Sequence, residues 1–360
     1  MSSASDAAPN ILVIRRRYLG DIVLLSSLLR NLRQHWPHAR LVLFCDRIYA
    51  GGAALLGEVD EVIHFPRRWG DWGPLVRRLR RAHFSHVLDC DNRDKTALFT
   101  RLTGASVRLT FNRDHPKFPF RHSWVYTDSV PMTREWYDGH SIIDIYHALL
   151  APLGVPVATR IPRFRLRQDD VAAMQRLVVG GSGARIAVHP GSRSPYRLWP
   201  ADRFAAVCDR LQDELGAQVF LVGGRGERDF IEAIRGQAQS HLVRVDQDLS
   251  VPELAAFFAQ FAVLLCHDSG PMHIAAGVGT RVVALYGSQN ATVWRPAGEG
   301  HLVLQTELPC SCIPAAELPK PCLKEDSYFS YCVRKIGVDE VFEAVATQLR
   351  SVGAAPPQPP

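Results

Sequence analysis

Four short segments of the chain combine glycine with acidic or hydroxyl side chains, a combination suited to binding phosphate and moving a proton. They are Gly20-Asp21 and the segments 189–192 (HPGS), 223–227 (GGRGE) and 268–271 (DSGP). Glycine lets backbone amides approach phosphate oxygens, and the positive end of a following helix favours the anion. A carboxylate beside such a loop can accept a proton or a hydrogen bond from a hydroxyl group. The four segments therefore predict a site for a phosphate-bearing ligand.

Alternating strands and helices are needed to position these segments. The strands expected from apolar runs are 11–14, 41–44, 62–65, 86–88, 185–188, 219–222, 242–245, 263–266 and 282–286. The helices expected from helical spacing are 22–32, 74–81, 201–215, 251–261 and 272–276. This alternation predicts an α/β fold with parallel sheets and crossover helices. Ligands of such sheets bind at the carboxyl ends of the strands, where all four segments lie.

The length of 360 residues and a break in the pattern at 151–156 predict two domains, 11–170 and 171–337, followed by a helix at 338–350. No apolar run reaches the roughly 20 residues needed to cross a bilayer, and the first ten residues do not have the pattern of a targeting signal. Eight cysteines spread over a chain of this size suit a reducing cytoplasm. We therefore expect a cytoplasmic protein.

The net charge of +6 is unevenly distributed. Residues 1–175 hold 25 Lys and Arg against 17 Asp and Glu, whereas residues 176–360 hold 17 against 19. A positive field suits nucleic acid, an anionic membrane surface or a polyanionic substrate. The chain shows no nucleic-acid module with interleaved stacking aromatics, so we expect no nucleic-acid partner. The densest basic stretch, 67–81, includes two tryptophans and suits either an anionic lipid surface or a solvated helix face.

Several common enzyme classes are excluded by their motifs. The segment Gly224-Arg225-Gly226 begins like a dinucleotide fingerprint, but Asp229 stands where its third glycine should be. The sequence contains no Walker A, HExxH or Gly-x-Ser-x-Gly motif. A dehydrogenase, a P-loop enzyme, a zinc protease of that type and an α/β hydrolase are all disfavoured.

Three motifs in series resemble those of the glycosyltransferase family 9 heptosyltransferases. They are ILVIRRRYLGDIVL at 11–24, HPGS at 189–192 with RLWP at 197–200, and DSGPMHIAA at 268–276. The resemblance extends from about residue 11 to 349, and YLGD with the WRP at 294–296 resembles the heptosyltransferase III-like branch. It implies a GT-B fold, in which two Rossmann-like domains face each other across a cleft. The first would bind the acceptor, the second would bind the nucleotide sugar, and the helix 338–350 would cross back to the first.

The reaction implied by the resemblance is inverting transfer of a heptose from ADP-heptose to the anionic inner core of lipopolysaccharide, without a metal or other cofactor. The enzyme would work in the cytoplasm, with peripheral contact at the cytoplasmic face of the inner membrane. Two alternatives stay open. One is a GT-B glycosyltransferase that uses another sugar nucleotide for a different surface glycan. The other is a nucleotide-sugar-binding protein without turnover.

The resemblance also implies roles for individual residues. Asp21 would be the general base, with helix capping as the alternative. The diphosphate would be held by the loop 268–273 and by Arg197, which stands where the family commonly has lysine. Because a guanidinium is planar and an ammonium is not, this departure bears on geometry or nucleotide preference. The expected donor-binding residues are Gly191, Ser192, Arg197, Glu227, Asp268, Ser269, Gly270, Pro271 and His273.

Acceptor and metal sites are less well marked. The expected acceptor-binding residues are Gly20, Arg93, Lys95, Arg113, Lys117 and Arg121, with plain surface charge as the alternative for the cations. Asp89-Cys90-Asp91 resembles a metal-binding DxD motif, but it lies far in sequence from the donor loops, and no metal is expected there. The cysteines at 310–332 lack paired CxxC spacing and are expected to be free thiols rather than zinc ligands. They are Cys310, Cys312, Cys322 and Cys332.

Overall fold

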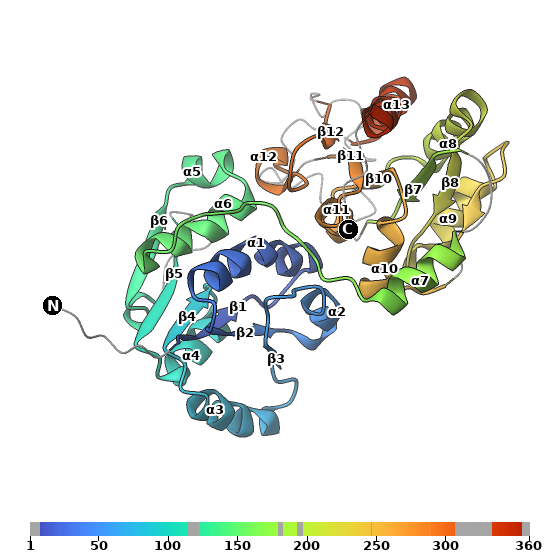
Figure 1. Cartoon of the computed structure of the whole chain (residues 1–360). Coiled ribbons are helices and arrows are strands. Elements are labelled where there is room, and N and C mark those ends of the chain that lie inside the picture. Colours follow the sequence, from blue (N-terminus) through green and yellow to red (C-terminus); the bar gives the residue numbers. More distant parts are fainter. Residues whose placement is uncertain are drawn as a thin grey trace, which may run out of the picture. The chain divides into compact units, whose positions relative to one another are not determined.

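The computed structural model describes residues 8–113, 122–178, 183–192, 197–245, 247–287, 289–306 and 333–354. The chain divides into two compact units, Met1–Arg165 and Leu166–Pro360 (Figure 1). The sequence placed the boundary at residue 170. The two domain roles stay predictions.

The first unit is built on a six-stranded parallel sheet in the order β3-β2-β1-β4-β5-β6. Its strands are β1 (Asn10–Ile14), β2 (Arg40–Cys45), β3 (Glu61–His64), β4 (His86–Asp89), β5 (Val107–Arg113) and β6 (Asp128–Met132). The central strands are near-continuous apolar runs because helices cover both faces of the sheet. In β1, residues 11–14 are all fully buried.

Helices of the first unit pack in two groups. One group contains α1 (Leu19–His35), α2 (Ala50–Ala53) and α6 (Ile142–His147), and the other pairs α3 (Trp72–Arg81) with α4 (Asp94–Thr103). A short α5 (Arg134–Gly139) follows β6. Under α3 and α4, the rings of Phe44 and Phe65 stack at 3.8 Å, and Phe99 of α4 meets both edge-on at 5.4 Å. These aromatic contacts fasten α4 to the sheet.

The second unit repeats the plan with the order β12-β11-β10-β7-β8-β9, again all parallel. Its strands are β7 (Arg185–His189), β8 (Gln218–Leu221), β9 (Val243–Arg244), β10 (Val263–His267), β11 (Arg281–Leu285) and β12 (Leu302–Leu304). Its helices are α7 (Gln168–Leu177), α8 (Ala201–Leu215), α9 (Arg228–Arg235), α10 (Val251–Phe258), α11 (Gly270–Gly277), α12 (Ala291–Trp294) and α13 (Val338–Ala354).

Helix α13 packs on α8 and on strands β10, β11 and β12 of the second unit. Its buried side chains Val341, Phe342 and Val345 join the same apolar cluster as Leu211 of α8. The expected crossing of this helix to the N-terminal domain stays a prediction. In the part of the chain that the structure describes, no helix is long and apolar enough to cross a membrane.

The α/β class and every strand and helix expected from the sequence are present, with ends that differ by a few residues. Strand β6 was not predicted. It is an edge strand with Pro131 at its penultimate position, and proline weakens a strand pattern although it is tolerated at sheet edges. Other elements not expected from the sequence are the strands β5 and β12 and the helices α2, α4, α5, α6, α7 and α12.

In each sheet the order in which strands are added reverses next to the first strand of the unit. From β1 the chain moves outward through β2 and β3 on one side, then returns to β4 on the other; β7 and β10 have the same relation. At such a switch point the loops leaving the two central strands diverge and open a crevice for ligands. The residues after β1, β4, β7 and β10 are therefore the ones to examine.

Candidate functional site

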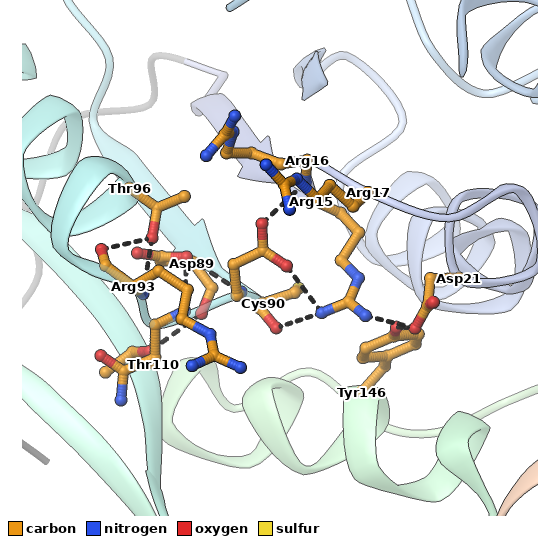
Figure 2. Close-up of polar contacts among 12 residues, drawn as sticks. Arg15, Arg16, Arg17, Asp21, Asp89, Cys90, Arg93, Thr96, Thr110 and Tyr146 are labelled. Carbon is orange, nitrogen blue, oxygen red and sulfur yellow. Dashed lines mark hydrogen bonds and ion pairs between the residues drawn. The ribbon is translucent and has the colours of Figure 1, made fainter. Parts of the chain in front are cut away.

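The guanidinium of Arg15, directly after β1, joins three elements of the first unit. Its Nη1 donates to Asp91 Oδ1 at 2.7 Å and to the Cys90 carbonyl at 3.0 Å, both after β4. Its Nη2 donates to Asp21 Oδ1 in the first turn of α1 (Figure 2). The hydroxyl of Tyr146, from α6, donates to the same oxygen of Asp21 at 2.8 Å.

The backbone turns sharply before Asp21. Helix α1 begins at Leu19, earlier than expected, so Gly20 lies inside the first helical turn and Tyr18 makes the turn with φ +71°. This left-handed conformation is costly for a residue with a Cβ, by about 1–3 kcal/mol, and such positions cluster at functional sites. Asp21 is the third helical residue, and the contacts of its carboxylate described above are to side chains, not to helix amides.

The carboxylate of Asp21 is buried, with 4% of the residue exposed. Burial raises its pKa, and the charge of Arg15 and the hydrogen bond from Tyr146 oppose that rise. Both contacts engage Oδ1, and within the described residues Oδ2 has no hydrogen-bond partner. Asp21 thus holds one fixed oxygen and one oxygen able to accept a proton.

Behind Arg15, Asp89 at the end of β4 fixes the loop that presents Asp91. Its Oδ1 accepts from the amides of Asp91 and Asn92, each at 3.0 Å, and its Oδ2 accepts from the Tyr126 hydroxyl at 2.7 Å. Burial, together with the charge of Asp91, raises the pKa of Asp89 to about 6. The Asp-Cys-Asp segment therefore holds a loop and an arginine, and the described residues contain no cluster of three metal-ligating side chains.

In the second unit, the loop after β7 passes very close to Glu227. A Cβ placed on Gly191 would lie 1.7 Å from Glu227 Oε1, so a larger residue at this position would displace that carboxylate. Oε2 of Glu227 accepts from the Gly224 amide at 2.7 Å and lies 3.5 Å from His189 Nε2. Burial lowers the pKa of His189, and the charge of Glu227 opposes that shift.

The loop after β10 leads directly into α11. Asp268 Oδ2 lies 3.4 Å from Arg197 Nη1, Ser269 is the N-cap, and Gly270 and Pro271 begin the helix. The Ser269 hydroxyl and His273 Nδ1 are buried and find no hydrogen-bond partner among the described residues. Burial lowers the pKa of His273 to about 4, so this side chain is neutral. Unpaired buried polar atoms at a helix N-terminus suit a bound anion or polar ligand.

Trp199 and Pro200 have packing and helix-starting roles. Trp199 is fully buried, its amide donates to His267 Nε2 at 2.8 Å, and its indole donates to the Ile336 carbonyl at 3.0 Å. Pro200 is the N-cap of α8. These bonds connect the segment bearing Arg197 to β10.

The remaining predicted residues lie in two groups. Arg93 and Lys95 follow β4, and Arg113 ends β5, so all three share the sheet edge at which Asp21 lies. Lys117, Arg121 and the four cysteines at 310–332 lie outside the described residues. The sequence motifs assign no role to Arg15, Tyr146 or Asp91. For Asp91, an acid two residues after β4 was an available signal; for Tyr146, in the middle of a helix, there was none.

Comparison with known proteins decides the family. Residues 72–322 match the family model described as "Glycosyltransferase family 9 (heptosyltransferase)". The chain belongs to glycosyltransferase family 9. It is therefore a glycosyltransferase of the heptosyltransferase family, as the sequence motifs indicated. The curated relatives include lipopolysaccharide heptosyltransferase 3 of Escherichia coli, 25% identical over 293 residues that cover 78% of this chain and 84% of the relative.

Solved structures show the same fold. A family 9 glycosyltransferase from Veillonella parvula DSM 2008 superposes with a TM-score of 0.80 at 21% identity, covering 97% of this chain and 100% of that one. Escherichia coli ADP-heptose lipopolysaccharide heptosyltransferase II gives 0.76 at 19% identity, covering 96% and 100%. Heptosyltransferase WaaC of the same organism, with ADP, gives 0.70 at 15% identity, covering 94% and 99%. The predicted GT-B fold is confirmed.

Replacing Arg15 with alanine tests the central ion pairs. The change leaves Asp21 and Asp91 buried without their cation, so we expect a loss of about 3–5 kcal/mol in the free energy of unfolding, measured by urea denaturation. Arg17→Ala is the matched control, because the Arg17 side chain is 61% exposed and should cost no more than about 0.5 kcal/mol. Equal effects of the two variants would contradict the arrangement.

The raised pKa of Asp89 predicts a pH-dependent stability. The folded state holds the proton of Asp89 more tightly than the unfolded state, whose pKa is near the ordinary 3.8, so stability decreases as pH rises from about 4 to about 6. Asp89→Asn removes this titration and keeps an acceptor for the two amides. The free energy of unfolding of the variant, measured by urea denaturation and taken relative to that of the wild type, should increase by about 3 kcal/mol from pH 4 to pH 7.

Asp169→Asn is the control for this comparison, because its side chain is 91% exposed. Its stability relative to the wild type should change little with pH. A difference between Asp89→Asn and the wild type that is the same at both pH values would show that Asp89 titrates normally.

Proposed function

We propose that this protein transfers a heptose, with inversion, from ADP-heptose to the inner core of lipopolysaccharide. The observation that supports this proposal is the placement of the family motifs at the switch points of the two sheets. Asp21 lies at the switch point of the first unit, and the unpaired Ser269 hydroxyl at the start of α11 lies at that of the second. The names of the relatives support the sugar, the donor and the acceptor.

In the proposed reaction Asp21 is the general base. Its free Oδ2 takes the proton of the acceptor hydroxyl while that oxygen bonds to the anomeric carbon of the heptose. The bond from the anomeric carbon to the diphosphate breaks, and its electron pair leaves with ADP. Arg15 and Tyr146 keep Oδ1 in place, so the carboxylate presents a single oxygen to the acceptor. Burial raises the pKa of Asp21, which makes its carboxylate a stronger base.

The second unit would hold the donor. Backbone amides at the start of α11 and the Arg197 guanidinium would bind the diphosphate, and Ser269 would donate to it through its hydroxyl. Asp268 would accept from a sugar hydroxyl, and Glu227 from the ribose. Loops at the same sheet edge would complete the site with Gly191, Ser192, Gly270, Pro271 and His273.

The first unit would hold the acceptor. Residues 1–175 have the excess of positive charge, and the inner core is anionic through its carboxylates and phosphates. Gly20 and the cations Arg93, Lys95, Arg113, Lys117 and Arg121 are the proposed acceptor contacts. The proposed domain plan assigns 11–170 to the acceptor, 171–337 to the donor and 338–350 to a helix that returns to the first domain. We place the reaction in the cytoplasm, at the inner membrane.

A titration with nucleoside diphosphates tests the donor. The purified protein, treated with EDTA, should bind ADP in calorimetry more tightly than GDP or UDP, because ADP would be the product that leaves the donor site. A donor with another nucleotide stays an alternative because Arg197 stands where the family commonly has lysine. Preference for GDP or UDP would replace the donor within the same fold, and no binding of any nucleotide would support a protein without this activity.

Two substitutions separate the base from the donor site. Asp21→Asn keeps an oxygen for Arg15 and Tyr146 but removes the base, so transfer should decrease about 10²–10⁴-fold with the Kd of ADP unchanged. Asp268→Ala should weaken ADP-heptose binding about tenfold through the lost hydrogen bond to the sugar. Asp169→Ala, at an exposed side chain, is the control for both. Normal turnover by Asp21→Asn would exclude it as the base, and normal donor affinity of Asp268→Ala would exclude its role.

A further inference from the structure

A hollow lies in the first unit, away from the candidate site. It has a volume of about 440 Å³ between α3 and the edge of the sheet. Its polar lining comes from Arg40, Glu61, Arg77, Arg78 and Arg81. Arg40 and Glu61 are the first residues of β2 and β3, so the hollow lies at the amino ends of these strands. Asp21 lies beyond the opposite, carboxyl end of the parallel strand β1. It is therefore a different surface from the one that holds the candidate base.

The lining has more positive than negative charge. The two carboxylate oxygens of Glu61 pair with Arg40 and Arg78. Within the described part of the chain, Arg77 and Arg81 make no ion pair, and both are exposed. Four guanidinium groups around one carboxylate repel one another, and a bound anion relieves that repulsion. The planar guanidinium is well matched to phosphate oxygens.

An exposed tryptophan stands at the other end of the same helix. Trp69, just before α3, is 84% exposed, and its ring stacks on Trp72 at 5.1 Å. Trp72 in turn lies 5.1 Å from Phe99 of the core. The exposed indole of Trp69 thus packs on aromatic side chains that reach the core. Because α3 is only about 15 Å long, this indole lies close to the basic hollow.

The segment 67–81 contains six arginines and one aspartate. Arg67 and Arg68 are exposed beside Trp69, and Arg77 and Arg81, one helical turn apart, point outward from α3. A surface that combines arginines with an exposed indole resembles the part of a membrane protein at the lipid headgroups, where tryptophan is enriched and cations meet lipid phosphates.

We propose that segment 67–81 is a docking surface for an anionic phospholipid bilayer, in which the hollow beside α3 receives a headgroup phosphate and Trp69 enters the interfacial layer. A bilayer interacts favourably with both the arginines and the exposed indole of this surface. A soluble phosphate would interact with the arginines but would leave Trp69 in water. The docking surface does not depend on the proposed transfer reaction, since none of its residues is assigned to the donor, the acceptor or the base.

Vesicle co-sedimentation of the full-length protein tests this proposal. The vesicles contain phosphatidylcholine alone or with phosphatidylglycerol, and neither lipopolysaccharide nor nucleotide is added, so the result is independent of the enzymatic activity. We expect binding to the anionic vesicles that decreases as salt is raised, and little binding to the neutral ones. The double variant R77E/R81E should bind the anionic vesicles at least about tenfold more weakly.

Matched controls separate this surface from overall charge and from exposed aromatics in general. R167E/R350E changes the net charge equally at side chains that are 72% and 66% exposed, and it should bind as the wild type does. Trp69→Ala should weaken binding several-fold, whereas Trp124→Ala, at a residue 71% exposed, should not. Circular dichroism confirms that each variant is folded.

Four results would overturn the proposal. They are equal binding to neutral vesicles, equal losses in the two double variants, unchanged binding by R77E/R81E, and no vesicle binding at all. Two further arms identify what the surface binds if it is not lipid. Inorganic phosphate that raises the melting temperature of the wild type but not of R77E/R81E, without vesicle binding, would assign a soluble anion site. Binding of a DNA duplex without vesicle binding would assign a nucleic-acid surface. Either of these results also rejects the bilayer.

Discussion

A buried guanidinium between two carboxylates organises the first unit. Removing an arginine from water is costly, and the cost is offset only when anions and carbonyl oxygens are in place around it. Arg15 therefore requires Asp21 on α1 and Asp91 after β4 at the same time. Asp89 and Tyr126 hold the loop of Asp91, and Tyr146 holds Asp21, so a chain of polar contacts joins four elements around one cation. The position of the candidate base is a consequence of that charge balance.

The second unit uses the same sheet plan with a different physical device. Its switch point contains three buried histidines, His189, His267 and His273, and burial lowers the pKa of each. Nδ1 of each ring is buried without a hydrogen-bond partner among the described residues, and rings of lowered pKa leave the local positive charge to Arg197 and to the start of α11. The first unit thus fixes an acid with an ion pair, whereas the second places buried imidazoles of lowered pKa around its loops.

Much of this arrangement could be predicted from the sequence. Strands such as 11–14 and 263–266 are apolar runs that are followed within a few residues by glycine or acid, and parallel sheets place such ends together, which identified Asp21, Gly191 and Asp268. The contacts of Arg15 could not be predicted in the same way. They depend on β1 lying beside β4, which is a property of sheet order, and Tyr146 reaches Asp21 from 125 positions away in the chain. The start of α1 was misplaced because the left-handed residue is Tyr18, not the neighbouring glycine.

The approach of Glu227 to Gly191 has a consequence for how this loop can change. The carboxylate occupies the volume that a methyl group at 191 would need, since the two would be separated by 1.7 Å. A side chain at 191 therefore displaces the Glu227 carboxylate, which ends a flexible side chain and can turn away. The loop after β8 then loses the acceptor that holds the Gly224 amide. A substitution in the loop after β7 thus changes the conformation of the loop after β8.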